Sequence, residues 1–198
     1  MSKSAPNGEF IRLYAAKAEA ERAEADLLDP GSAAAGSFGP GAAAILLLRG
    51  EPHSSQAASG GPLSPPEAEA AARALAALGL PADDVAAVCT RSAGGADDSG
   101  SAARRLSLTV EASDPAWVIA LDRNAGVDAA SVLGLDALLP GVPLVRSGRV
   151  WLVVDDLEAS LGDPARKRRV WAQLRGLADV RPEGQSAGSE PGPVGAGS

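Results

Sequence analysis

Cysteine and histidine each occur once among the 198 residues, as Cys89 and His53. A single thiol cannot close a disulfide within the chain, and it cannot supply the thiolate ligands of an iron–sulfur cluster. We therefore expect neither a metal centre nor a cofactor.

Aromatic side chains are also few, at 3 % of the residues against 45 % for all hydrophobic types. The chain is long enough for one domain with a sizeable core, which must be built mainly from Ala, Leu and Val. No stretch approaches the ~20 consecutive apolar residues that span a bilayer. The N-terminus is polar and lacks the apolar segment of a signal peptide. We expect a soluble, cytoplasmic protein with no membrane partner.

Basic residues are outnumbered by acidic ones: the chain has 18 Lys and Arg residues and 25 Asp and Glu residues, which gives a net charge of −7. This balance weighs against an ordinary nucleic-acid binder, whose affinity comes largely from basic side chains on phosphates. The densest basic cluster, Arg-Lys-Arg-Arg at residues 166–169, lies at the start of a predicted helix. Such a run is more often a solvated helix face than a phosphate site.

The feature around which the chain is organised is a short apolar run, Ile-Leu-Leu-Leu at residues 45–48. Such a run is typical of a strand buried on both faces of a parallel sheet. A long polar loop follows, and then a helix start with Ser64 as the candidate N-cap and Glu67 three residues later, as in a capping box. In an open α/β sheet, ligands usually bind beyond the carboxyl end of such a strand. The loop therefore holds two candidate catalytic residues, Glu51 and His53.

The remaining sequence mixes short apolar runs with helical patterns. The run at residues 85–89 follows the helix predicted at 66–78 and completes a βαβ unit with parallel strands. We expect an N-terminal helix and a Gly/Ala-rich linker over residues 1–41 and one domain over residues 42–180. Residues 181–198 are rich in Gly, Pro and Ser and predict a disordered tail. Strands are predicted at residues 45–48, 85–89, 105–111, 117–121, 142–145 and 150–154, and helices at residues 9–28, 66–78, 124–133 and 164–177. Residues 92–103 predict a loop, and residues 146–149 predict a hairpin-type connection or an extended pair.

The first strand and its loop resemble the first motif of the uracil-DNA glycosylase superfamily. In that family, Gly-Glu-Ala-Pro-Gly ends the strand, and Gly-x-Pro-Phe precedes the next helix. Here Gly50 and Glu51 keep the first pair, and residues 60–63 read Gly-Gly-Pro-Leu. Leu63 thus stands where the family has the aromatic residue that stacks on the target base.

The C-terminal part resembles the family's second motif, in which a strand leads to His-Pro-Ser/Ala, then x-Pro, then a helix with a Trp near its middle. Residues 150–154 match the strand, Pro164 the x-Pro and Trp171 the helix. Counting back from Pro164 puts Asp156 where the family has its His. Counting along the second strand puts Cys89 where the family has the Asn that reads the base.

The resemblance covers residues 42–177 and implies an α/β fold, a three-layer sandwich with a central, mostly parallel sheet. It also implies a base pocket that includes Leu63 and Cys89, and a catalytic position at Asp156. Cleavage of the glycosidic bond leaves negative charge on the departing pyrimidine, which a His can stabilise by donating a hydrogen bond. An ionised Asp cannot donate, and a thiol is a weak donor and a weak acceptor.

The leading hypothesis is a uracil-DNA-glycosylase-like domain without ordinary glycosylase activity, which serves in binding or structure. One alternative is an active DNA base-excision N-glycosylase of DNA repair with altered base preference. It would use Glu51 or Asp156 to position water and His53 as the donor. A second alternative is a small-ligand or protein-interaction module. DNA or a nucleobase is the candidate partner under the first two hypotheses, and we lean toward a protein that is not an enzyme.

One prediction follows from the cysteine content. The purified protein should carry no iron and show no visible-range absorbance, because Cys89 is the only thiol. Metal analysis and an absorption spectrum of the protein as isolated test this expectation. Iron bound within one protomer at near one cluster per chain would contradict it.

Overall fold

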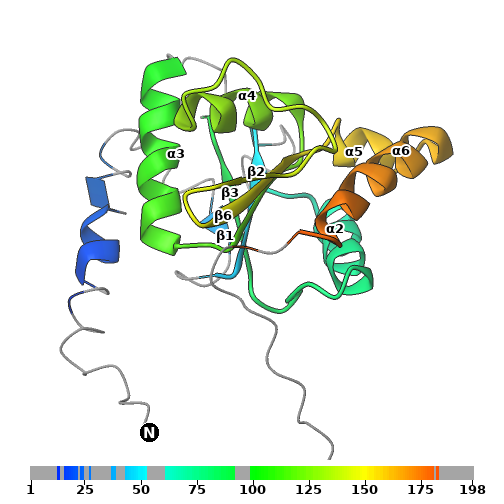
Figure 1. Ribbon diagram of the computed structural model, residues 1–198, viewed down its shortest axis with the longest axis horizontal. Helices are drawn as coiled ribbons and strands as arrows, with labels where there is room; N and C mark the ends of the chain where they lie inside the picture. The colour runs from blue at the N-terminus through cyan, green and yellow to red at the C-terminus, as the bar shows by residue number, and fades with distance from the viewer. Residues whose placement is uncertain are drawn as a thin grey trace, which may run out of the picture.

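The computed structural model describes residues 43–52, 61–91 and 99–180 without a break, and outside these ranges residues 13, 16–21, 23–24, 27, 37–38 and 182. A central sheet lies between two layers of helices (Figure 1), so the predicted α/β architecture with a mostly parallel sheet is confirmed. Among the described helices, none combines the length and the hydropathy needed to cross a membrane.

The sheet has six strands in the described chain, in the order β1-β3-β2-β4-β6-β5. The four inner strands are parallel, and the outer strands β1 and β5 pair antiparallel with β3 and β6. Ile45 is level with both Val85 and Trp117, and Trp117 is level with Val150, so the inner strands start together and end at one edge. The strands are β1 (Ser37–Phe38), β2 (Ile45–Arg49), β3 (Val85–Cys89), β4 (Trp117–Ala120), β5 (Leu144–Arg146) and β6 (Arg149–Val153).

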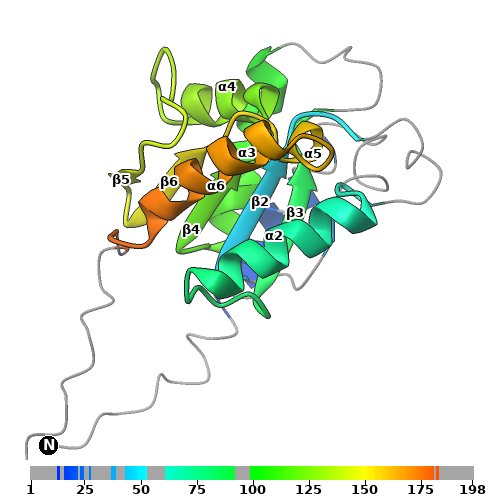
Figure 2. The same cartoon turned by 90° about the vertical axis from the view of Figure 1, so that its right-hand side faces the viewer.

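Both faces of the sheet are covered, which explains the unbroken apolar run of β2. Ile45 and Leu47 point to one face, where they pack with Leu75 of α2 and Val170 of α6. Leu46 and Leu48 point to the other face, which α3 and α4 cover. Figure 2 shows α2, α5 and α6 together on the first face. The helices are α2 (Pro65–Ala77), α3 (Ser99–Ser113), α4 (Arg123–Val132), α5 (Leu157–Ser160) and α6 (Pro164–Leu174), with a 3-10 turn η1 (Arg175–Leu177).

The strand predicted at residues 105–111 is wrong, because this segment lies within helix α3. The loop predicted at residues 92–103 is wrong over residues 99–103, which belong to α3, and its other residues lie outside the described part of the chain. Leu106 and Val110 are four residues apart, so an alternating pattern and a helical pattern both place them on one face. The buried side chains on this face are those of Leu106 and Val110, whereas Leu108 is only half-buried. The hydroxyl of Thr109 donates to the carbonyl of Arg105 one turn earlier, which suits a helix (3.0 Å).

Of the two arrangements predicted for residues 146–149, a hairpin-type connection or an extended pair, the structure shows the hairpin. Strands β5 and β6 are joined at Ser147 and Gly148, whose φ angles are 54° and 76°. Positive φ at both central residues is the conformation of a type I′ turn, whose twist matches that of the strands. Strand β6 is the outermost of the four parallel strands and pairs with β4. Its carboxyl end therefore lies on the same side of the sheet as those of β2 and β4.

The segments at the two ends of the chain are described only in part. The described positions between 13 and 27 are helical, as predicted, and Leu13 and Leu27 are 65 % and 79 % exposed. Glu24 of this helix pairs with Arg104 of α3 (2.6 Å), which places it beside α3. Pro182 is buried, whereas the rest of the tail predicted at 181–198 lies outside the described residues.

The helical assignment of α3 predicts unequal effects of two neighbouring leucines. Replacing Leu106 by Ala should lower the free energy of unfolding by about 2–5 kcal/mol, because the side chain is buried at 2 % exposure. Replacing the half-buried Leu108 by Ala should cost less than about 1 kcal/mol. Urea unfolding followed by circular dichroism measures both. Equal losses would contradict the helix, since a strand would point both side chains to the same face.

Candidate functional site

The carboxyl ends of the four parallel strands meet at one edge of the sheet, where the sequence predicted a ligand site. Arg49 ends β2, Thr90 and Arg91 follow β3, Asp122 follows β4, and Asp156 follows β6. The backbones of Asp122 and Asp156 form a bridge, which draws the ends of β4 and β6 together. Polar residues from all four strands are therefore concentrated at this edge.

Arg49 is the centre of a cluster of carboxylates. Its guanidinium Nη1 donates to Glu67 Oε1 (2.8 Å), and its Nη2 donates to Glu158 Oε2 (2.6 Å). Asp122 Oδ2 lies 3.3 Å from Nε, and Asp156 Oδ1 lies 3.8 Å from Nη1. Burial by itself would lower the pKa of the Arg49 guanidinium, but the surrounding carboxylates raise it. Arg49 therefore stays charged, and its charge is neutralised within the protein.

Glu67 is the most deeply buried member of this cluster, with an exposed fraction of 1 %. It lies in the first turn of α2, and its backbone N–H donates to the hydroxyl of the N-cap Ser64 (3.3 Å), as the predicted capping box requires. Desolvation raises the pKa of the Glu67 carboxyl to about 7, although the nearby Arg49 acts in the opposite direction. The Glu67–Arg49 contact ties the start of α2 to the end of β2.

Asp122 connects β4 to both the first strand and α4. Its Oδ1 accepts from the backbone N–H of Ala125 as the N-cap of α4 (2.9 Å), and its Oδ2 accepts from the N–H of Gly50 (2.8 Å). A Cβ atom at Gly50 would lie 2.5 Å from the Cβ of Asn124, so only glycine fits here. The Gly of the Gly-Glu pair thus allows close approach of α4 to the end of β2.

A second buried network lies next to the Arg49 cluster and surrounds Asp128 of α4, which is 1 % exposed. The guanidinium of Arg91 donates two hydrogen bonds of 2.9 Å to the Asp128 carboxylate, and the Thr90 hydroxyl donates to the same carboxylate at 2.6 Å. The guanidinium of Arg105 donates to the carbonyl oxygen of Thr90. Arg91 and Arg105 are therefore also engaged within the protein.

Asp156, the predicted counterpart of a catalytic His, acts as a hydrogen-bond acceptor. Its Oδ1 caps α5 by accepting from the backbone N–H of Ala159 (3.0 Å), and the same atom faces Arg49. The neighbouring Asp155 turns away, since its carboxylate lies 3.7 Å from Arg169 and its N–H donates to Gln173. The aspartate pair is therefore split between two partners and does not form a carboxyl dyad.

Of the two predicted base-pocket residues, Cys89 is buried and Leu63 is partly buried against the core. Cys89 is 7 % exposed, and burial raises the pKa of its thiol to about 12, so the thiol stays neutral near pH 7. It is level with Arg49 in the neighbouring strand. Leu63 is half-buried and packs against the cluster between α2 and the sheet. The structure thus brings Cys89 and Asp156 near Arg49, whereas the side chain of Leu63 contributes to the core.

The remaining predicted residues are on the first loop. Glu51 is exposed at the carboxyl edge, and its charge contributes to the raised pKa of Arg91, after the dominant hydrogen bond from that guanidinium to Asp128. His53 lies outside the described residues. Within the described part of the chain, no group of three or more His, Cys, Asp and Glu side chains is arranged to hold a metal ion.

Sequence reasoning missed Arg49, Asp128 and Arg91. A signal was available for Arg49, because it is the first charged residue after an apolar strand and lies directly before the Gly-Glu pair. For Asp128 the signal was weaker, namely a lone acid among the small residues of a helix. Only the packing of α4 against the sheet shows that this acid faces inward.

The chain matches no model of a known protein family and no curated protein. The likeness to the uracil-DNA glycosylase superfamily therefore rests on the short motifs in the sequence, and it stays a prediction.

The buried position of Glu67 predicts a pH-dependent stability. The carboxyl binds its proton more tightly in the folded protein, where its pKa is about 7, than in the unfolded chain, where it is about 4.5. The resulting stabilisation is fully present below pH 4.5 and is lost as the pH rises through 7, with a total on the order of 3 kcal/mol. Glu67→Gln should remove this slope between pH 4.5 and 7, as measured by urea unfolding at a series of pH values.

The matched control is Glu69→Gln, because Glu69 lies on the same helix and is exposed. This variant should keep the slope of the wild-type protein. If the Glu67→Gln protein kept it as well, Glu67 would not be the titrating group.

Proposed function

We propose that this chain is a non-catalytic domain on a uracil-DNA-glycosylase-like scaffold, which serves in binding and has no ordinary glycosylase activity. The observation that supports this proposal most directly is the surrounding of Arg49 by four carboxylates at the carboxyl edge of the sheet. This edge is where the sequence resemblance would put the target base.

The first supporting argument concerns the departing base. Stabilising a pyrimidine anion requires hydrogen-bond donors or cations aimed at its oxygen. The guanidinium of Arg49 is already held by Glu67 and Glu158, and Asp156 offers acceptor atoms. Carboxylates at this position would repel the charge that develops during cleavage.

The second argument concerns the DNA backbone. Binding to DNA requires Lys or Arg side chains that can neutralise phosphates. Near the predicted site, Arg91 is held in a bidentate pair by Asp128, and Arg105 donates to a backbone carbonyl. Since these cations are engaged by the protein's own groups, phosphates would have to displace buried partners.

The third argument concerns recognition of the base. Stacking on an aromatic side chain is worth roughly 1–3 kcal/mol per base in nucleic-acid complexes. Leu63 cannot supply a π face, and its half-buried side chain packs against the core. Cys89 holds a neutral, buried thiol where the family has an amide. Three contributions to catalysis would thus be lost together.

We expect no measurable excision of uracil from single- or double-stranded DNA. Loss of one preorganised donor to an oxyanion costs about 10²–10³ in rate, and the other losses add to this. The assay uses a labelled oligonucleotide with one uracil, excess protein, and alkali to cleave abasic sites. A uracil-DNA glycosylase serves as the positive control.

Strand cleavage that is present with the wild-type protein and disappears in Glu51→Ala would contradict the proposal and favour an active N-glycosylase. If no cleavage is seen, the combined variant Asp156→His, Cys89→Asn and Leu63→Phe tests the resemblance itself. Recovered excision would support the matching of these three positions to the family's motif.

A further inference from the structure

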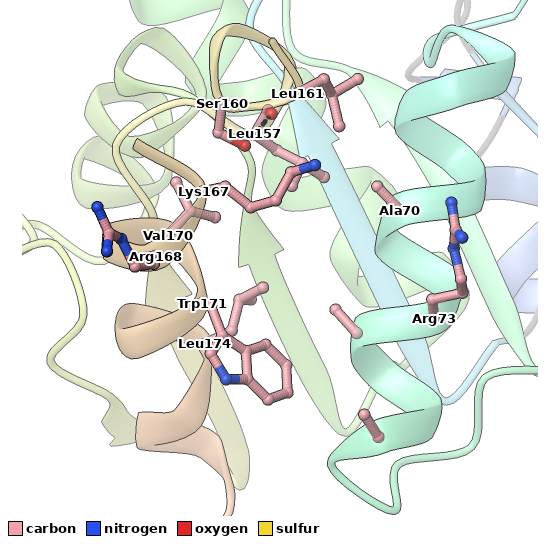
Figure 3. Close-up of a pocket in the computed structure, with 12 residues that line it drawn as sticks. Ala70, Arg73, Leu157, Ser160, Leu161, Lys167, Arg168, Val170, Trp171 and Leu174 are labelled. Carbon is pink, nitrogen blue, oxygen red and sulfur yellow. Dashed lines mark hydrogen bonds between the residues drawn. The ribbon is translucent and has the colours of Figure 1, made fainter. Parts of the chain in front are cut away.

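An open apolar groove lies between α2 and α6 on the face of the sheet that carries α5 (Figure 3). Its volume is about 470 Å³. On the α2 side the apolar wall is built from Ala70, Ala74 and Ala77, whose small side chains leave space in front of α6. Trp171 on the opposite wall is 37 % exposed, so a large apolar side chain faces the groove. The apolar lining includes Ala70, Ala74, Leu157, Leu161, Trp171 and Leu174.

The rim of this groove is basic, although the whole chain is acidic. Arg73, Lys167 and Arg168 line it. Within the part of the chain that the structure describes, Lys167 and Arg168 have no carboxylate partner, whereas Arg166 and Arg169 of the same run pair with aspartates. Arg73 has an exposed pair with Glu69 at 3.2 Å, which contributes little in water. The basic run at residues 166–169 therefore divides into two paired and two available cations.

We propose that this groove binds an acidic amphipathic helix of a partner protein. An apolar face with large side chains would fill the space between the α2 wall and Trp171, as in helix-in-groove recognition. Acidic residues flanking that face would meet Lys167 and Arg168. The 13 residues of α2 make a wall about 20 Å long, which suits three to four turns of a docked helix. This inference deepens the proposed binding function by naming its partner, and it rests on that function.

Other occupants fit the groove less well. A second copy of the chain in a two-fold contact would bring the same basic rim against itself. The chain's own last residues, 183–198, contain Val194 as their only large aliphatic side chain. A single-stranded nucleic acid could use the cations, but it would leave the aliphatic floor at Leu157 and Leu161 poorly covered.

The test uses the full-length protein and a fluorescein-labelled helical peptide of about 14 residues. The peptide has Leu at every third or fourth position and Glu on the flanks of this apolar stripe. A sister peptide carries Lys in place of Glu, and a scrambled peptide has the same composition as the first without the stripe. Fluorescence anisotropy should show at least about tenfold tighter binding of the Glu peptide than of either control.

Two groove variants locate the binding. Trp171→Ala should weaken the Glu peptide by at least about tenfold, as expected for a central aromatic anchor. Lys167→Glu with Arg168→Glu should weaken it by about tenfold, and should at the same time strengthen binding of the Lys peptide. This exchange of preference cannot arise from misfolding. The matched control, Arg123→Glu with Arg146→Glu, changes the charge equally at exposed positions outside the groove and should leave both affinities unchanged within about twofold.

Equal affinity for the Glu and Lys peptides, or failure of the charge-reversed variant to exchange its preference, would overturn the proposal. A labelled single-stranded oligonucleotide that binds through Lys167 and Arg168 while the peptide does not would assign the groove to nucleic acid. A dimer in sedimentation that Trp171→Ala converts to monomers would assign it to a second copy. The uracil excision assay does not involve the groove, so failure of this inference and failure of the proposed function are distinguishable.

Discussion

The arrangement of the carboxyl edge depends on the ion pairs that the guanidinium of Arg49 makes with the surrounding carboxylates. It joins the end of β2 to the first turn of α2 through Glu67, to the start of α4 through Asp122, and to α5 through Glu158. A buried charge is stable only when it is paired, and removing one partner of such a pair typically costs about 3–5 kcal/mol. One side chain thus joins three helices, on both faces of the sheet, to the end of β2. In the neighbouring network, Asp128 joins α4 to Thr90 and Arg91 at the end of β3 in the same way.

This use of charge has a consequence for function. In an open α/β sheet the carboxyl edge is the usual ligand site, and a binding site there needs polar groups that are free to meet a ligand. Here the guanidinium of Arg49 lies among the carboxylates of Glu67, Asp122, Asp156 and Glu158. Lys167 and Arg168 of α6 lie beside an apolar groove and pair with no carboxylate of the described residues. The sheet thus has the open α/β architecture, while the charged groups at the carboxyl ends of its strands are paired within the protein.

The two motifs that resemble the uracil-DNA glycosylase superfamily have structural roles of their own. Gly50 permits contact with α4, and Asp156 caps α5. Asp163 caps α6 by accepting from two backbone N–H groups, and these hydrogen bonds lower the pKa of its carboxyl. Short motifs at strand ends can therefore be explained by turn and cap chemistry alone, without any catalytic role.

Local sequence patterns determined most of the architecture. The apolar run at residues 45–48, the capping box at Ser64 and Glu67, and the Ser-Gly turn each act within a few residues, so their structures could be predicted. The helix α3 could not, because Leu106 and Val110 share a face in a strand and in a helix, and the packing against the sheet decides between them. Tertiary structure alone also decided the site, since the partners of Arg49 lie up to 109 positions away in the chain. Pairing over such a distance depends on strand order and burial, which no local pattern encodes.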